Sequence, residues 1–316
     1  SLMTSLFTFC PVAIAVAVTV LLSLKPQTRR LIKQLTREDV YATLKFAVIT
    51  AIILPVLPNQ TFGPPPLNVL NPYTIWLMVV LVSGVSFLGY VLIKVVGAER
   101  GIGLAGLMGG LVSSTGVTVS FAQRSRKGED LLKPFALAIS IAWAVMFLRV
   151  LVIVSVLNLK LLNSLWLPLL AAALPGAVYS LFLYRSQRSD DLHEVPVSNP
   201  FYLEPALKFG AFYVLILLVI SLSRSNLGNP GIYLSSLVGG LASVDAIVVS
   251  MANLSQGATP LDEAIASRSI MLATLSNTLF KAGILLVAGD QRLFRIIFPV
   301  ALVTFLIGLG VAFWYL

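Results

Sequence analysis

The chain has 316 residues, of which 58% are hydrophobic and only 11% are charged, and its mean hydropathy is +0.94. These values exclude a soluble globular domain, because 22 Lys and Arg and 13 Asp and Glu residues are too few to cover the surface of a soluble protein of this size. The net charge of +9 does not indicate a nucleic-acid partner, since most basic residues lie in loops beside apolar segments, where they set membrane orientation. We therefore predict an all-α integral membrane protein that crosses the lipid bilayer several times.

Ten apolar segments follow one another, most of them near the length of about 20 residues that a helix needs to cross the hydrocarbon core. The first has no basic region before it and several basic residues after it, which favours a retained helix over a cleaved signal peptide. The segments cover residues 5–24, 40–57, 72–96, 101–123, 132–157, 161–184, 202–223, 229–255, 262–288 and 293–315.

One stretch of sixteen residues occurs twice, as LMGGLVSSTGVTVSFA at 107–122 and as LVGGLASVDAIVVSMA at 237–252. Eight of the sixteen positions are identical, and both copies concentrate Gly and Ser within an apolar segment. Around this motif, residues 72–186 and 200–316 each contain four segments in the same order, which predicts two membrane repeats. Residues 1–57 stand outside the repeats as an N-terminal two-helix segment.

The distribution of basic residues predicts how the motif segments sit in the membrane. If all ten segments cross, the inside loops hold 11 Lys and Arg residues and the outside loops hold 7. If segments 101–123 and 229–255 instead enter and return on one side, the counts become 15 and 3, which fits the positive-inside rule much better. This favours about eight transmembrane helices plus two re-entrant or broken helices. Three full spans per repeat then make the second repeat inverted, while parallel repeats with spanning motif segments stay the alternative.

The motif supplies candidate ligands for an ion or substrate. The paired glycines permit a helix break or a close helix approach, and the hydroxyls beyond them, with one carboxylate, suit a cation. The alternative is simple packing of small residues. An acid inside a membrane segment is a functional candidate by default, so Asp245 is also the candidate metal ligand. The candidate residues are Gly109, Gly110, Ser113, Ser114, Thr115 and Ser120 in the first copy, and Gly239, Gly240, Ser243, Asp245 and Ser250 in the second.

Three further polar residues lie in the long segments that follow each motif. Arg149 follows the first copy, while Asn277 and Lys281 follow the second and, being four residues apart, share one helix face. An intramembrane acid commonly pairs with a base. We expect Lys281 or Arg149 to be the charge partner of Asp245, either for ion or proton transfer or as a structural ion pair.

No constellation of an enzyme is visible in the sequence. There is no Cys and His cluster of the kind that holds zinc, no phosphate-binding loop, and no nucleophile with a base at a recognisable spacing. We predict that the protein is not an enzyme, and the sequence indicates no cofactor.

Several stretches together carry a resemblance to a known family. They are TREDVYATLKFAVI, NPYTIWLMVVLVSGVSFLGY, GGLVSSTGVTVSFAQRSR, AWAVMFLRVLV and GGLASVDAIVVSMA. Over about residues 36–316 the chain resembles the domain of unknown function that often follows the MgtC/SapB region in bacterial membrane proteins. The resemblance implies a multi-pass protein of the inner membrane of a prokaryote, with a link to magnesium and ion homeostasis, and with the upstream MgtC-like region missing or reduced here.

These observations lead to three hypotheses. The first is an ion channel or transporter in which a cation, Mg²⁺ or a monovalent or proton-coupled ion, passes between the two motifs. The second is a pathway for an inorganic or small organic anion, attracted by helix N-termini, Lys281 and Arg149. The third is a regulatory or scaffold subunit that transports nothing. A homo-oligomer, most simply a dimer, is expected from its general frequency alone.

Overall fold

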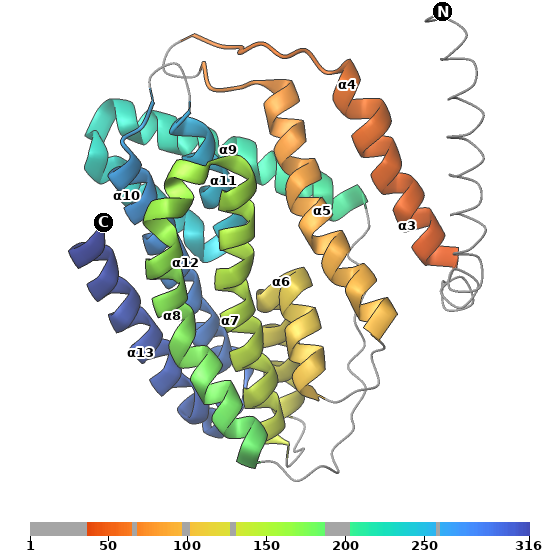
Figure 1. Cartoon of the computed structure of the whole chain (residues 1–316), viewed down its shortest axis with the longest axis vertical. Coiled ribbons are helices and arrows are strands. Elements are labelled where there is room, and N and C mark those ends of the chain that lie inside the picture. Colours follow the sequence, from red (N-terminus) through yellow and green to blue (C-terminus); the bar gives the residue numbers. More distant parts are fainter. Residues whose placement is uncertain (1–36, 65–67, 97–101, 127–130, 187–202, 257–259) are drawn as a thin grey trace, which may run out of the picture. The chain divides into compact units, whose positions relative to one another are not determined.

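The computed structural model describes residues 37–64, 68–96, 102–126, 131–186, 203–256 and 260–316 (Figure 1). The predicted helix at 5–24 lies outside the described residues. The chain separates into two compact units, residues 1–41 and 42–316, and the second holds all of the long described helices.

Among the described residues, seven helices are long and apolar enough to cross a membrane. This result confirms the prediction of a multi-pass, helical membrane protein. Segment 40–57 is built differently, from α3 (Arg37–Ala47), the π-helix η1 (Val48–Ile53) and α4 (Leu54–Val56), and its apolar part is shorter than a span. The seven long helices are α5 (Pro72–Val96), α6 (Ile102–Ser125), α7 (Leu132–Leu157), α8 (Leu159–Ser186), α9 (Leu203–Leu227), α12 (Glu263–Ala288) and α13 (Gln291–Tyr315).

The core of the second unit forms around α7 and α12. The most apolar window of α7 is 72% buried and that of α12 is 61% buried, against 28% for α5 and for α9. Small side chains on these two helices, including Ala142 and Ala273, let neighbouring backbones approach closely. The outer faces of α8 and α13 expose large apolar side chains such as Phe182 and Phe313, as helices in contact with lipid do.

Two helices are interrupted, each at the serine of a Gly-Gly-Leu-x-Ser motif. In α6, Ser113 has extended backbone angles, φ −163° and ψ 102°. Ser243 has nearly the same angles, φ −154° and ψ 113°, and separates α10 (Asn229–Ala242) from α11 (Val244–Leu254). We call α6 the first interrupted helix, and α10 with α11 the second interrupted helix.

Both interrupted helices bend sharply at the serine. A Cβ placed on Gly109 would lie 2.6 Å from Cγ2 of Val117, and a Cβ placed on Gly239 would lie 2.7 Å from Cδ1 of Ile247. Residues eight apart in an unbroken α-helix are separated by about 12 Å along the axis. Each interruption is therefore a sharp bend that brings the residues one turn before and one turn after the serine together.

The C-terminal end of each interrupted helix is called its far end. The far end of the first interrupted helix is hydrogen-bonded to the junction between α12 and α13. Arg126 donates hydrogen bonds from Nη2 to the carbonyl of Val287 at 2.5 Å and from Nε to the carbonyl of Gly289 at 3.2 Å. The backbone N–H of Asp290 donates to Oγ of Ser125 at 2.9 Å. The two bonds from Arg126 supply donors to carbonyls at and just beyond the end of α12, where the helix itself provides none.

The far end of the second interrupted helix makes the reciprocal contact with the junction between α7 and α8. Gln256 donates from Nε2 to the carbonyl of Leu157 at 2.8 Å, and Asn158 donates from Nδ2 to Oγ of Ser255 at 2.9 Å. Because α7 begins just after the first interrupted helix and α12 just after the second, these contacts make α7 and α12 antiparallel. The two interrupted helices thus end at opposite ends of this pair.

Candidate functional site

A cavity of about 210 Å³ lies between the two interruptions. By volume it has room for several water molecules. Residues from both copies of the motif line it, together with residues of α7 and α12. The lining consists of Gly110, Val112, Ser113, Ser114, Thr115, Met146, Arg149, Ala242, Ser243, Val244, Asp245 and Asn277.

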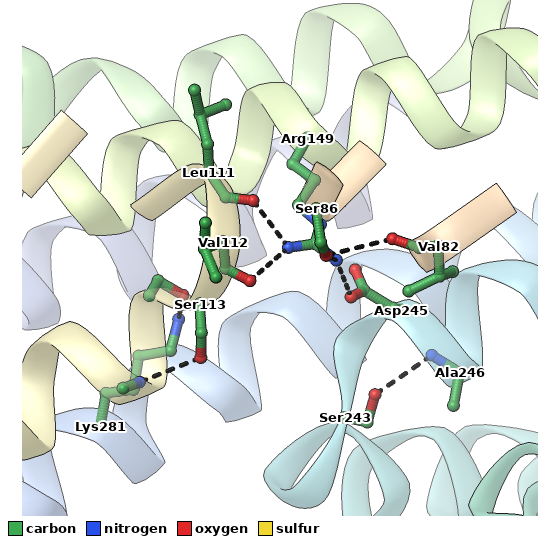
Figure 2. Close-up of polar contacts among 12 residues, drawn as sticks. Val82, Ser86, Leu111, Val112, Ser113, Arg149, Ser243, Asp245, Ala246 and Lys281 are labelled. Atoms are coloured by element: carbon green, nitrogen blue, oxygen red, sulfur yellow. Dashed lines mark hydrogen bonds and ion pairs between the residues drawn. The ribbon is translucent and has the colours of Figure 1, made fainter. Parts of the chain in front are cut away.

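Each interruption ends with a serine that caps the second half of its helix. Oγ of Ser113 accepts a hydrogen bond from the backbone N–H of Gly116 at 3.1 Å, and Oγ of Ser243 accepts one from Ala246 at 3.3 Å (Figure 2). A serine is a favoured N-cap because its hydroxyl replaces one missing helix acceptor. The N–H groups just after each cap have no acceptor within the helix and carry the positive end of its dipole. Both helix N-termini border the cavity.

Side chains of α7 and α12 donate hydrogen bonds to backbone carbonyls near the end of the first half of each interrupted helix. In the first interrupted helix, Nη1 of Arg149 donates to the carbonyls of Leu111 and Val112, both at 2.9 Å (Figure 2). In the second, Ser276 donates to the carbonyl of Leu237 at 2.9 Å and Asn277 donates to that of Gly240 at 2.8 Å. The side chains that bond to the first halves thus differ: a cation holds the last two carbonyls of the first half of α6, and neutral side chains bond to carbonyls slightly earlier in α10.

Arg149 also forms an ion pair with Asp245. Its Nη2 lies 2.7 Å from Oδ2 of Asp245, and the two side chains are 8% and 23% exposed (Figure 2). The same Nη2 donates to Oγ of Ser86 at 3.2 Å, and Ser86 in turn donates to the carbonyl of Val82 at 3.1 Å. The sequence offered two charge partners for Asp245, namely Lys281 and Arg149. In the structure the ion pair is with Arg149.

Lys281 lies behind the wall of the cavity with no exposed surface. Its Nζ donates to Oγ of Ser114 at 2.8 Å and to Sδ of Met146 at 2.7 Å. In the described part of the chain its hydrogen-bond partners are thus a hydroxyl and a thioether, and no carboxylate contacts it. Asn277, one helical turn before it, lines the cavity itself.

The motif glycines allow close packing on α7 and α12. A Cβ on Gly110 would lie 2.7 Å from Cα of Ala142, and one on Gly240 would lie 2.5 Å from Cα of Ala273. Gly109 and Gly239 instead face Val117 and Ile247, in the second half of their own interrupted helix. Of the four glycines only Gly110 lines the cavity.

Some predicted residues lie away from the cavity, and some cavity partners were not predicted. Ser120 and Ser250 lie two turns beyond the interruptions and do not line it, and Oγ of Ser250 donates to the carbonyl of Ala246. Sequence reasoning missed Ser86, Met146 and the carbonyls held by Arg149. Ser86 gives no sequence signal that separates it from a serine used in helix packing, and backbone carbonyls give none at all.

The amino-acid sequence of the chain matches one known protein family. The profile of the family described as "Domain of unknown function (DUF4010)" matches residues 80–289. The chain belongs to this family. The matched range contains every residue that lines the cavity, so the site lies within the DUF4010 domain. An uncharacterized protein of Aquifex aeolicus (strain VF5) is 33% identical over 193 residues, which cover 60% of this chain and 83% of that protein. No solved structure matches the chain. The link to MgtC/SapB proteins and to magnesium stays a prediction.

Proposed function

We propose that this DUF4010 protein transports a small ion across the membrane, through the cavity between the two interrupted helices. The observation that carries the proposal is that both interruptions border one polar cavity within an apolar bundle. Non-helical backbone at membrane depth is tolerated where it is buried in protein or lines a wet cavity. Secondary transporters often bind their substrates between discontinuous helices of this kind. The inner membrane of a prokaryote is the proposed location.

The proposal includes an inverted internal repeat of residues 72–186 and 200–316, with re-entrant interrupted helices. Matching contacts support it: Gly110 packs on Ala142 as Gly240 packs on Ala273. The reciprocal contacts at the two far ends support it as well, since a two-fold relation produces each contact twice. The antiparallel course of α7 and α12, the equivalent long helices, favours inverted over parallel repeats. Re-entry would let each interrupted helix reach the cavity from its own side of the membrane.

The cation hypothesis rests on one observation, namely that Asp245 lines the cavity with its side chain 23% exposed, although Arg149 already pairs with it. A cation that binds there must share this carboxylate with Arg149 or displace it. Mg²⁺ usually takes one or two carboxylates together with waters or phosphates, and Asp245 is the single acid of the cavity lining.

Flux through the purified protein in liposomes tests the proposal, across a panel of K⁺, Na⁺, Mg²⁺, H⁺, Cl⁻ and nitrate. A single cysteine at Ser113, in a Cys10→Ser background, brings a thiol reagent into the cavity, and Ser225→Cys on the exposed side of α9 is the matched control. We expect selective flux that the reagent blocks in Ser113→Cys and leaves unchanged in Ser225→Cys. Absence of flux for every ion would support a regulatory subunit instead, and flux that the reagent leaves unchanged in both variants would place the pathway elsewhere.

A further inference from the structure

We infer that the cavity between the interrupted helices binds a small monovalent anion, so that the ion transported under the proposed function is an anion. The inference rests on the proposed function for the transport step, and on the cavity alone for the binding step. Four features of the cavity and its wall support it: the balance of charge, the hydroxyl groups, the backbone N–H groups and the apolar part of the lining.

The first feature is an excess of buried positive charge. Asp245 pairs with Arg149 at 2.7 Å and also interacts electrostatically with Lys281, so one carboxylate faces two basic side chains. Lys281 is fully buried and, in the described part of the chain, contacts only Ser114 and Met146 through its amino group. A buried ammonium with no carboxylate in direct contact is costly in a membrane bundle. An anion in the cavity, on the other side of Ser114, would supply a counter-ion.

The second feature is the direction of the serine hydroxyls. Ser113, Ser114 and Ser243 all line the cavity, and each accepts a hydrogen bond from a fixed donor, either a backbone N–H or the Lys281 ammonium. None of the three donates to another group in the described part of the chain. A hydroxyl has a single proton, which is therefore free to point at a ligand that accepts. In Ser114 that proton is made more acidic by the ammonium behind it, which strengthens the bond it donates.

The third feature is the supply of unpaired donors. Ser114 and Thr115 begin the second half of the first interrupted helix, and Val244 and Asp245 begin α11, so two helix N-termini border one cavity. Arg149 also lines it and is more than nine-tenths buried, and its Nε has no hydrogen-bond partner among the described residues. Donors that border a shared cavity favour an anion over a cation.

The fourth feature limits which anions fit. Val112, Met146, Ala242 and Val244 form apolar parts of the wall. An ion that enters loses water there, and divalent anions such as sulfate hold their water more strongly than chloride or nitrate do. The ligand is therefore a halide or a small oxyanion with a single charge, and a short carboxylate has the same chemistry.

Anion binding is tested by measuring the melting temperature of the purified full chain in detergent. Sodium nitrate or sodium chloride replaces sodium gluconate stepwise at constant ionic strength. Gluconate is the bulky reference anion. We expect nitrate and chloride to raise the melting temperature and sulfate to have little effect. Lys281→Met, which keeps the apolar length without the charge, should raise the apparent Kd for nitrate about tenfold or more. Lys160→Met, at an exposed lysine at the start of α8, should leave the Kd unchanged.

Ser114→Ala provides a second variant of lower structural cost, and it should also weaken nitrate binding. A melting temperature that is the same in nitrate, chloride and gluconate would overturn the inference, as would nitrate binding that both variants leave intact. The liposome panel separates this failure from failure of the proposed function. Flux of cations alone would overturn the anion assignment and keep the transport function, while absence of all flux would overturn transport itself.

Discussion

Arg149 and Asp245 join the two interrupted helices through one guanidinium group. Its Nη2 lies 2.7 Å from the carboxylate at the start of α11, while its Nη1 holds the last carbonyls of the first half of α6. A single side chain of α7 thus connects the carbonyl end of one interruption to the N-terminal turn of the other. Loss of this side chain should loosen both interruptions together.

Asp245→Asn and Arg149→Gln should each lower the free energy of unfolding by about 3 kcal/mol, because each leaves a largely buried charge without its partner. The double variant should be less destabilised than the sum of the two, by more than about 1 kcal/mol. Chemical denaturation in detergent measures these energies. Arg292→Gln is the control, since Arg292 is 75% exposed and lies 3.9 Å from Asp290, and it should change stability by less than about 1 kcal/mol. Additive effects at Arg149 and Asp245 would show that the pair is not coupled.

Gly110→Ala and Gly240→Ala should each destabilise the protein, because the added Cβ meets backbone atoms of α7 or α12 at 2.7 Å or less. We expect a loss of about 1–3 kcal/mol, as for overpacking in other cores, measured by thermal unfolding. Gly283→Ala on α12 is the matched control, since a Cβ there meets nothing within 4 Å. If all three variants melt at the same temperature, the close packing of α6 and α10 on α7 and α12 is wrong.

Ser113→Ala and Ser243→Ala remove the two N-caps and should each cost about 1 kcal/mol of stability. The same change at Ser225, whose hydroxyl only donates back to the carbonyl of Leu222 in its own helix, should cost less. Ser243→Asn should recover most of the loss, because asparagine is also a good N-cap. Equal losses at Ser225 and Ser243 would argue against capping.

Hydrogen exchange should show that the contact of Arg126 with the end of α12 and the contact of Gln256 with the end of α7 are independent of each other. Arg126→Ala should speed amide exchange at the end of α12, because the carbonyls of Val287 and Gly289 lose their side-chain donor. Gln256→Ala should speed exchange at the end of α7 and leave the end of α12 unchanged. Arg185→Ala, at the exposed end of α8, serves as the control for loss of an arginine. Faster exchange at both ends in either variant would show one cooperative unit in place of two separate contacts.

Local features of the amino-acid sequence predict much of this arrangement. Composition and segment length predict the multi-pass helical bundle, and the duplicated motif marks the two segments that are interrupted. The paired glycines left open a helix break or a close helix approach. The structure shows the approach at Gly110 and Gly240, and places the break three residues later, at a serine that can cap the next half-helix.

Other features depend on which helices meet, and the sequence alone does not contain that information in readable form. Lys281 and Arg149 were equal candidates as partners of Asp245, because both are intramembrane cations on long helices. Their different roles follow from the tertiary contacts of α12 with Ser114 and of α7 with α11. The contacts of Arg126 and Gln256 were not predicted either, because a polar residue at the end of an apolar segment is equally compatible with a position in a solvated loop.

Under the proposed function, two equivalent interrupted helices approach one cavity from opposite sides of the membrane. Single cysteines at Arg126 and Gln256, in a Cys10→Ser background, test this arrangement most directly with a membrane-impermeant thiol reagent. The two positions lie near opposite ends of α7, whose 26 residues rise about 39 Å, enough to cross a bilayer. We predict that Arg126→Cys is labelled from the cytoplasmic side only and Gln256→Cys from the opposite side only. Labelling of both cysteines from the same side would contradict the inverted arrangement.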